Sequence, residues 1–338
     1  MKRYLNSPPP PGYKYDEASI RRGRGGRITK ITEPKEDQDT AAKKNKVVLL
    51  DKVKDIFNSR CTTEIILNNN KPVLSFIMPW FRAQYLGWLP LEALCRQINI
   101  DFSWELIIIE ENLENPFGLD NLKKYIDRLK KVNCVNITYI SLREWIPLSC
   151  KWYYLIKQCD INSEIVAMNP HDIYFPNNRL HKQYYTLINS DFNWYKTAGN
   201  ILYDIKSNKH VRYKYTSSDR PDTCLQTAKK EILDKLPLFY KTKGIDGERY
   251  KYLKKYLHYY YDTDEEWINK TININGLNNL SRSRTKKMND TKEYLQLTTQ
   301  LHEHLPLDIS KKLKESWRHI EEYKNLVNNS NLNLPKYY

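Results

Sequence analysis

Short apolar runs alternate with segments of helical periodicity between residues 71 and 172 of this chain. Each run ends in polar or turn-forming residues, and the segments between runs carry apolar side chains three and four positions apart. Such continuous runs are typical of strands buried on both faces of a parallel sheet. The pattern predicts strands at 73–78, 104–109, 135–140 and 164–168, with helices at 85–97, 121–131 and 152–159. We therefore expect an α/β fold with a mostly parallel sheet flanked by helices, which binds its ligands at the carboxyl ends of the strands.

The segment before this pattern has a different composition. Residues 1–45 contain four consecutive prolines at 8–11 and an arginine-glycine run at 21–27. Because such a composition buries little apolar surface, we expect an extended or flexible basic arm. Helical spacing at 47–57 marks the beginning of the ordered part.

The rest of the chain divides into one domain and an extension. We expect the domain to cover 46–285, with a nucleotide half at 71–180 and an acceptor half at 181–285. Residues 286–338 are expected to form a helical C-terminal extension. Two further helices are expected at 223–236 and 251–260.

Positive charge is concentrated in one part of the chain. The sequence has 55 Lys and Arg against 40 Asp and Glu, a net charge of +15. Residues 205–255 hold 14 basic and 6 acidic residues, with tyrosines interleaved. This composition, together with the arginine-glycine arm, favours a nucleic acid or another polyanion as partner. A solvated lysine-rich face is the alternative.

The hydropathy of the chain bears on where it works. No apolar run approaches the roughly 18 residues that a membrane span requires. The N-terminus carries prolines and arginines and no apolar leader segment. We expect no membrane span, no secretion and a cytoplasmic protein, in the host cytoplasm if the chain is viral or from a phage. Oligomerisation stays open.

Three segments at expected strand ends carry a family resemblance. They are Leu74–Pro79 followed by Trp80-Phe81-Arg82, Glu105–Glu111 followed by Asn112, and Asn169-Pro170-His171-Asp172 followed by Ile173–Leu180. In this order and spacing they resemble the nucleotide-sugar half of glycosyltransferase family 2 and the related enzymes of the GT-A fold. The resemblance extends over residues 71–285 and implies a GT-A type sheet.

The resemblance implies a reaction and a set of donor-binding residues. The chain would transfer a hexose from a nucleotide sugar, a UDP-sugar by preference, to an acceptor hydroxyl with inversion. The implied donor-binding residues are Pro79, Trp80, Arg82, Glu110, Glu111, Lys151 and Asn169. Glu110 or Glu111 would accept hydrogen bonds from uracil or ribose, and Lys151 would face the diphosphate. Their alternatives are a solvated turn and an ordinary surface lysine.

The implied metal motif departs from the family pattern. Where the family has two aspartates, this chain has Asn169 and His171, and only Asp172 remains acidic. Imidazole is a softer ligand than carboxylate, so we expect His171 and Asp172 to hold Mn²⁺ in preference to Mg²⁺. In the alternative interpretation, His171 is a turn histidine without a ligand role.

A second segment supplies the candidate catalytic acids. Gly244–Tyr250 resembles the family's Gly-Glu-Asp segment, although the order of residues differs. Asp246 or Glu248 would take the proton from the acceptor hydroxyl. An N-capping aspartate followed by a first-turn glutamate explains the same residues through helix chemistry alone.

Three functions compete at this point. The first is a glycosyltransferase that uses a nucleotide sugar and an anionic acceptor such as modified DNA. The second is a catalytically inactive GT-A-like binding or structural protein, which the altered metal motif favours. The third is a nucleotidyltransferase on a similar sheet, which the absence of a glycine-rich loop after the first strand disfavours.

Overall fold

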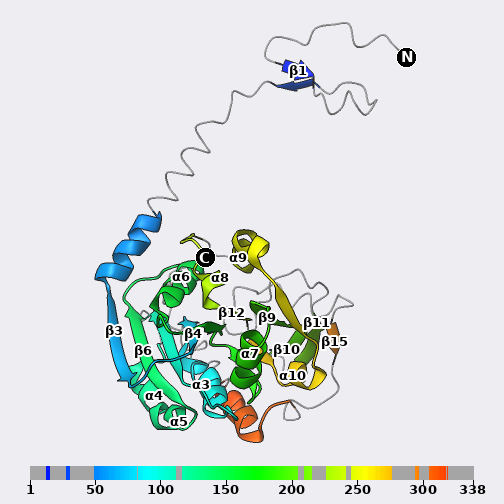
Figure 1. Ribbon diagram of the computed structural model, residues 1–338. Coiled ribbons are helices and arrows are strands. Elements are labelled where there is room, and N and C mark those ends of the chain that lie inside the picture. Colours follow the sequence, from blue (N-terminus) through cyan, green and yellow to red (C-terminus); the bar gives the residue numbers. More distant parts are fainter. Residues whose placement is uncertain are drawn as a thin grey trace. The chain divides into compact units, whose positions relative to one another are not determined.

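The computed structural model describes residues 13–15, 28–30, 49–81, 83–111, 116–204, 209–214, 226–240, 245–275, 294–296, 304–316 and 318 (Figure 1). The chain divides into two units, Met1–Asp51 and Lys52–Tyr338. In the first unit, strand β1 (Tyr13–Tyr15) pairs antiparallel with β2 (Ile28–Lys30). The arginine-glycine run of the predicted arm lies outside the described residues.

The second unit is organised around an eight-stranded sheet with the strand order β13-β9-β12-β7-β4-β5-β6-β3. The strands are β3 (Cys61–Asn68), β4 (Leu74–Trp80), β5 (Trp104–Glu111), β6 (Cys134–Leu142), β7 (Ile165–Met168), β9 (Trp194–Thr197), β12 (Gln226–Lys229) and β13 (Tyr259–Asp262). Pairs β13-β9, β7-β4, β4-β5 and β5-β6 are parallel, and the other three are antiparallel. The predicted α/β fold with a mostly parallel sheet is confirmed.

Alternate residues of the central strands pack into two separate apolar clusters, one on each face of the sheet. The first face is covered by α3 (Trp88–Cys95), α4 (Leu119–Lys123), α5 (Ile126–Lys130) and α7 (Arg179–Ile188). The second face is covered by α6 (Leu148–Gln158), α8 (Lys230–Leu233), α9 (Ile245–Leu253) and the helical residues 52–59. The helices can be followed by their labels in Figure 1. Burial on both faces explains why the central strands are mostly apolar.

A second, five-stranded sheet has the strand order β15-β11-β10-β14-β8. Its strands are β8 (Ile173–Tyr174), β10 (Gly199–Asp204), β11 (Lys209–Lys214), β14 (Ile272–Asn275) and β15 (Tyr294–Gln296). The remaining short helices are η1 (Ala83–Tyr85), η2 (Lys254–Tyr256) and α10 (Glu265–Asn269). Residues 307–316 are helical and bury Leu313, in the region where a helical extension was expected.

Two predicted helices are helical only in part. The 223–236 segment contains strand β12, which pairs antiparallel with β7 and β9 before the short helix α8 begins. Pairing with two neighbouring strands satisfies the backbone groups of β12 and overrides its weak local helical pattern. The 251–260 segment is α-helical to Leu253, continues as the 3₁₀-helix η2 to Tyr256, and ends in β13.

Three smaller predictions need correction or comment. The first strand was expected to stop at Pro79 but continues to Trp80, because both residues lie in register with β5. The 121–131 helix is divided into α4 and α5. Of the described helices, none has the length and apolar character needed to cross a bilayer.

Candidate active site

The order of the parallel strands reverses beside β4. From β4 the chain proceeds to β5 and β6 on one side and then returns to β7 on the other side. In open α/β sheets, ligands bind outside the carboxyl ends of the strands at such a reversal. The carboxyl ends of β4, β5 and β7 therefore define where a site is expected. Of the predicted donor residues, Asn169 follows β7, Lys151 lies on α6, and the ends of β4 and β5 are formed by Pro79, Trp80, Glu110 and Glu111.

Glu110 and Glu111 end β5 and point to opposite faces of the sheet. Glu110 accepts hydrogen bonds from the backbone N–H groups of Phe117 (2.6 Å) and Gly118 (3.0 Å) and from the hydroxyl of Tyr139 (2.6 Å). Burial raises the pKa of Glu110 above its usual value. Because side chains alternate along a strand, Glu111 faces α6 instead. The two glutamates therefore have different surroundings, although the sequence presents them as a pair.

Lys151 on α6 places a positive charge on the second face of the sheet, next to the ends of β4 and β5. Its ammonium group lies 2.6 Å from Oε1 of Glu111 and donates a 3.2 Å hydrogen bond to the carbonyl oxygen of Trp80. The ring centroid of Phe81 is 5.3 Å from the same nitrogen. Lys151 is only 3% exposed. Lys151 therefore links the end of β4 to the end of β5 through these two contacts.

The turn after β7 presents His171 and Asp172, whose side chains are half-buried. Burial lowers the pKa of His171, the charge of Asp172 opposes this shift, and the charge of Lys151 reinforces it. The turn thus lies within electrostatic range of Lys151. The carbonyl oxygen of Asp172 accepts a 2.8 Å hydrogen bond from the N–H of Ile274, which ties the turn to β14. His171 and Asp172 are the more accessible layer of the site, and Lys151 and Glu111 are the buried layer.

Asn169 is held by a buried arginine. Its Oδ1 accepts a 2.6 Å hydrogen bond from Arg179, and its Nδ2 donates to the carbonyl oxygen of Pro170. Arg179 is fully buried, donates to the carbonyl oxygen of Met168 and to Gln183, and lies against two phenylalanine rings. These contacts fix the turn after β7 against the beginning of α7.

Helix α9 brings the candidate catalytic acids to the same end of the sheet. Arg249 of α9 donates a 3.2 Å hydrogen bond to the sulfur of Met168, the last residue of β7. Its guanidinium carbon lies 5.5 Å from the ring centroid of Trp152, the neighbour of Lys151. Glu248 is half-buried and forms a 2.7 Å ion pair with Lys251. Asp246 belongs to α9, and its side chain lies outside the described set.

The other predicted donor residues lie at the end of β4 or just after it in the sequence. Pro79 and Trp80 are its last two residues and are buried, with the Trp80 ring edge-on to Phe117 at 5.2 Å. Arg82 and Asn112 lie outside the described residues. Within the described part of the chain, no group of three or more His, Cys, Asp and Glu side chains is arranged to hold a metal ion.

Sequence reasoning missed Arg179 and Arg249. Arg179 occupies the first turn of α7, where a cation is unfavourable unless a local partner holds it, so its position was a usable signal. Arg249 lies three residues after Asp246, on the helix already singled out for its acids. Nothing in its spacing indicated contact with β7.

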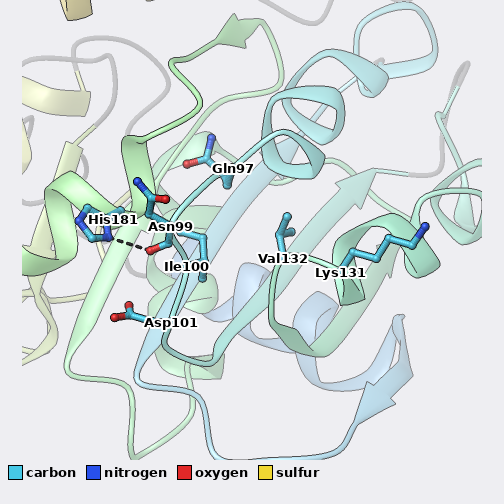
Figure 2. A pocket seen from close by; sticks show the side chains of 7 residues that line it. All are labelled: Gln97, Asn99, Ile100, Asp101, Lys131, Val132 and His181. Atoms are coloured by element: carbon cyan, nitrogen blue, oxygen red, sulfur yellow. Dashed lines mark hydrogen bonds between the residues drawn. The ribbon is translucent and has the colours of Figure 1, made fainter.

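A cavity of about 400 Å³ lies at the opposite end of the sheet (Figure 2). It is lined by Gln97, Asn99, Ile100, Asp101, Lys131, Val132 and His181. These residues precede β5 and β6 or belong to α7. The carbonyl oxygen of Asn99 is 2.8 Å from Nδ1 of His181, as the dashed line in Figure 2 marks. None of the predicted site residues lines this cavity.

Comparison with known proteins gives matches at the level of structure. No protein-family model matches the sequence, and no curated protein matches it. S. aureus TarS in complex with UDP-GlcNAc is 11% identical with a TM-score of 0.47, over 61% of this chain and 59% of that chain. The mannosyltransferase PcManGT from Pyrobaculum calidifontis, in complex with GDP-Man and Mn²⁺, is 12% identical with a TM-score of 0.41, over 86% of this chain and 84% of that chain.

A third similar structure is that of a synthase. The 4-diphosphocytidyl-2C-methyl-D-erythritol synthase from Anaerococcus prevotii is 13% identical with a TM-score of 0.35, over 73% of this chain and 96% of that chain. The chain spans about 60% of the length of the TarS 1–349 chains that it matches, and 36% of a longer TarS chain.

Proposed function

We propose that this chain is a GT-A type glycosyltransferase that transfers a sugar from a UDP-sugar to an acceptor hydroxyl. The observation that carries the proposal is the convergence of Lys151, Glu111, His171 and Asp172 at the carboxyl ends of β4, β5 and β7. Glu111, His171 and Asp172 come from the segments that resemble the family's donor site. They also lie at the strand-order reversal, where an α/β sheet binds its ligands.

The two layers of the site would have different roles in donor binding. A diphosphate leaving group gains negative charge as its bond to the sugar breaks, so nearby fixed cations stabilise the transition state. Lys151 supplies such a charge, and Glu111 holds its ammonium group in place. Glu110 and Asn169 would contribute indirectly, because their polar atoms are already hydrogen-bonded within the protein. Glu110 would hold residues 117–118 in place, and Asn169 would hold the turn after β7.

The residues of the turn fit a divalent cation that the donor itself helps to hold. The lowered pKa of His171 favours the neutral imidazole, which is the form that binds a metal ion. Asp172 adds one carboxylate, and diphosphate oxygens and water would complete the coordination. A bound Mn²⁺ would neutralise charge on the leaving diphosphate. The nitrogen ligand favours Mn²⁺ over Mg²⁺.

The transfer would be a single displacement with inversion. The bond between the anomeric carbon and the phosphate oxygen breaks, the acceptor oxygen bonds to the same carbon, and UDP leaves. The hydroxyl proton passes to a carboxylate of α9, Asp246 or Glu248. This assignment is supported by Arg249, which anchors α9 at the end of β7. For the acceptor we propose an anionic polymer such as modified DNA, because residues 205–255 carry 14 basic and 6 acidic side chains.

Calorimetric titration of UDP in the presence of Mn²⁺ tests the donor site. We expect the double variant His171→Gln, Asp172→Asn to bind UDP about tenfold or more weakly, as the removal of charge-assisted interactions implies. The matched control is His181→Gln, Asp101→Asn, which changes the same residue types at the cavity of Figure 2. Equal weakening in both variants, or no weakening in the first, would overturn the assignment.

A non-catalytic binding protein is the second candidate. Two observations favour it: the amide of Asn169 is engaged by Arg179, and the described residues hold no group of three metal-binding side chains. Such a protein would bind UDP-sugar without breaking it. Slow release of free sugar from UDP-sugar in the presence of Mn²⁺ separates the two, since only an enzyme hydrolyses the donor when the acceptor is absent.

A further inference from the structure

Gln226, the first residue of β12, has a buried amide group for which the described residues offer no hydrogen-bond partner. The residue is 1% exposed, and neither Oε1 nor Nε2 is hydrogen-bonded. The other buried glutamines among the described residues behave differently. Gln97 donates to two carbonyl oxygens and accepts from Leu180, and Gln183 accepts from Arg179 and Thr227. An unpaired buried amide is costly, so its presence at a strand end indicates a ligand.

The register of the sheet places Gln226 beside two functional elements. Gln226 lies opposite Met168, the last residue of β7. On its other side, Thr227 lies opposite Tyr195, so Lys196 of β9 is the neighbour of Gln226. Ala228 and Trp194 both pack on the second face, and therefore Gln226 and Lys196, two positions away, point to that face as well. Gln226 and Lys196 thus form a row at the carboxyl end of β7.

Two buried cations belong to this row. Lys196 is 1% exposed, and its ammonium group lies 4.8 Å from the ring centroid of Tyr259 and 5.4 Å from that of Tyr261. Arg249 is 4% exposed and reaches the row from α9 through its hydrogen bond to Met168. The row therefore combines an amide with two side chains that can only donate.

We infer that Gln226, Lys196 and Arg249 form a subsite for a phosphate group of the second substrate, with Nε2 of Gln226 donating to phosphate and its Oε1 accepting from a neighbouring hydroxyl. Arginine and lysine are the usual donors to phosphate oxygens. The subsite comes from β12, β9 and α9, whereas the donor end comes from β4, β5 and β7. Its description as the acceptor's subsite rests on the proposed function. The phosphate chemistry does not, because it follows from the row itself.

Calorimetric titration of the full chain with inorganic phosphate, before and after saturation with UDP, tests this subsite. Gln226→Leu should weaken phosphate binding about tenfold or more. It should also raise Tm by about 2 °C, since it removes an unpaired buried amide. Gln97→Leu is the matched control, which should lower Tm and leave phosphate affinity unchanged. The double variant Lys151→Met, Glu111→Gln should lose UDP binding and keep phosphate binding.

The outcomes separate this inference from the proposed function. If neither the wild type nor any variant binds UDP, the proposed function fails. If Gln226→Leu nevertheless binds phosphate more weakly than the wild type, the subsite stands. If wild type binds no phosphate, or if Gln226→Leu binds it like wild type, the subsite is overturned. Loss of phosphate only in the Lys151→Met, Glu111→Gln variant would place the phosphate at the donor end and would also overturn it. A lower Tm for Gln226→Leu would show that its amide has a structural partner, which contradicts the inference.

Discussion

The Lys151–Glu111 ion pair is the electrostatic centre of the proposed donor site. Both charges are buried, 2.6 Å apart, and lie where two parallel strands end. A buried ion pair adds little net stability, but either charge left alone in the interior is strongly unfavourable. The pair is therefore a sensitive point of the molecule, where a change intended to affect donor binding also affects folding.

We predict that Lys151→Met alone lowers the free energy of unfolding by about 3 to 5 kcal/mol, because it leaves the Glu111 carboxylate without its cation. Adding Glu111→Gln should restore most of this stability. Urea denaturation of the three proteins measures both effects. If the single variant is as stable as wild type, Glu111 does not depend on Lys151, and the two-layer description of the site is wrong.

Asn169 offers a second residue-scale prediction. Asn169→Leu should cost about 1 to 3 kcal/mol, because an Arg179 donor would lose its buried acceptor. Asn169→Asp should be tolerated, since a carboxylate can accept the same hydrogen bond from the guanidinium. Thermal unfolding at neutral pH compares the two variants. Destabilisation of Asn169→Asp as large as that of Asn169→Leu would contradict this description of the Arg179 hydrogen bond.

At the scale of elements, strands that are apolar throughout could be predicted and strands defined by their partners could not. β4, β5 and β7 are buried at every position, so each presents a mostly apolar run in the sequence. β12 reads Gln-Thr-Ala-Lys and has a single apolar residue, and its conformation depends on pairing with β7 and β9. No local pattern contains that information, which is why a helix was expected there.

Two glycines test how the elements pack. A Cβ on Gly87, just before α3, would lie 2.8 Å from Cγ of Phe117 and 3.0 Å from the carbonyl oxygen of Ala83, whereas a Cβ on Gly247 in α9 would meet open space. Gly87→Ala should therefore cost about 1 to 3 kcal/mol by overpacking. Gly247→Ala should be neutral or stabilise by up to about 1 kcal/mol, because alanine favours the helix. Chemical denaturation measures both, and a reversed order would contradict the packing of α3 on the 117–118 turn.

At the scale of the whole molecule, the site divides into a part that can be predicted from the sequence and a part that only the fold assembles. His171, Asp172 and Lys151 follow or precede predicted elements in the nucleotide half, so their meeting at one sheet edge could be expected. Gln226 and Arg249 reach the same edge from later segments, through an antiparallel strand and a returning helix. Their contribution depends on strand order, which a single sequence does not contain.

The basic segments lead to a prediction about the whole chain. If residues 205–255 and the arm bind a polyanion, log affinity for DNA or RNA should fall linearly with log salt, with a slope near 4 to 5 in magnitude for about five phosphate contacts. Deleting residues 1–45 should make the slope shallower by about one unit for each phosphate that the arm binds. Filter binding across a salt series measures both. A flat response in both proteins would remove nucleic acid from the proposed partners, and lower stability after deletion with an unchanged slope would assign the arm to packing.

The central claim is that the carboxyl ends of β4, β5 and β7 bind a nucleotide sugar, and a crystal structure of the chain with UDP and Mn²⁺ tests it most directly. The account predicts the diphosphate beside Lys151, with His171 or Asp172 within about 2.5 Å of the metal ion, near the upper end of coordination distances. UDP bound elsewhere, for example in the amino-end cavity of Figure 2, or a metal ion that neither side chain touches, would contradict it.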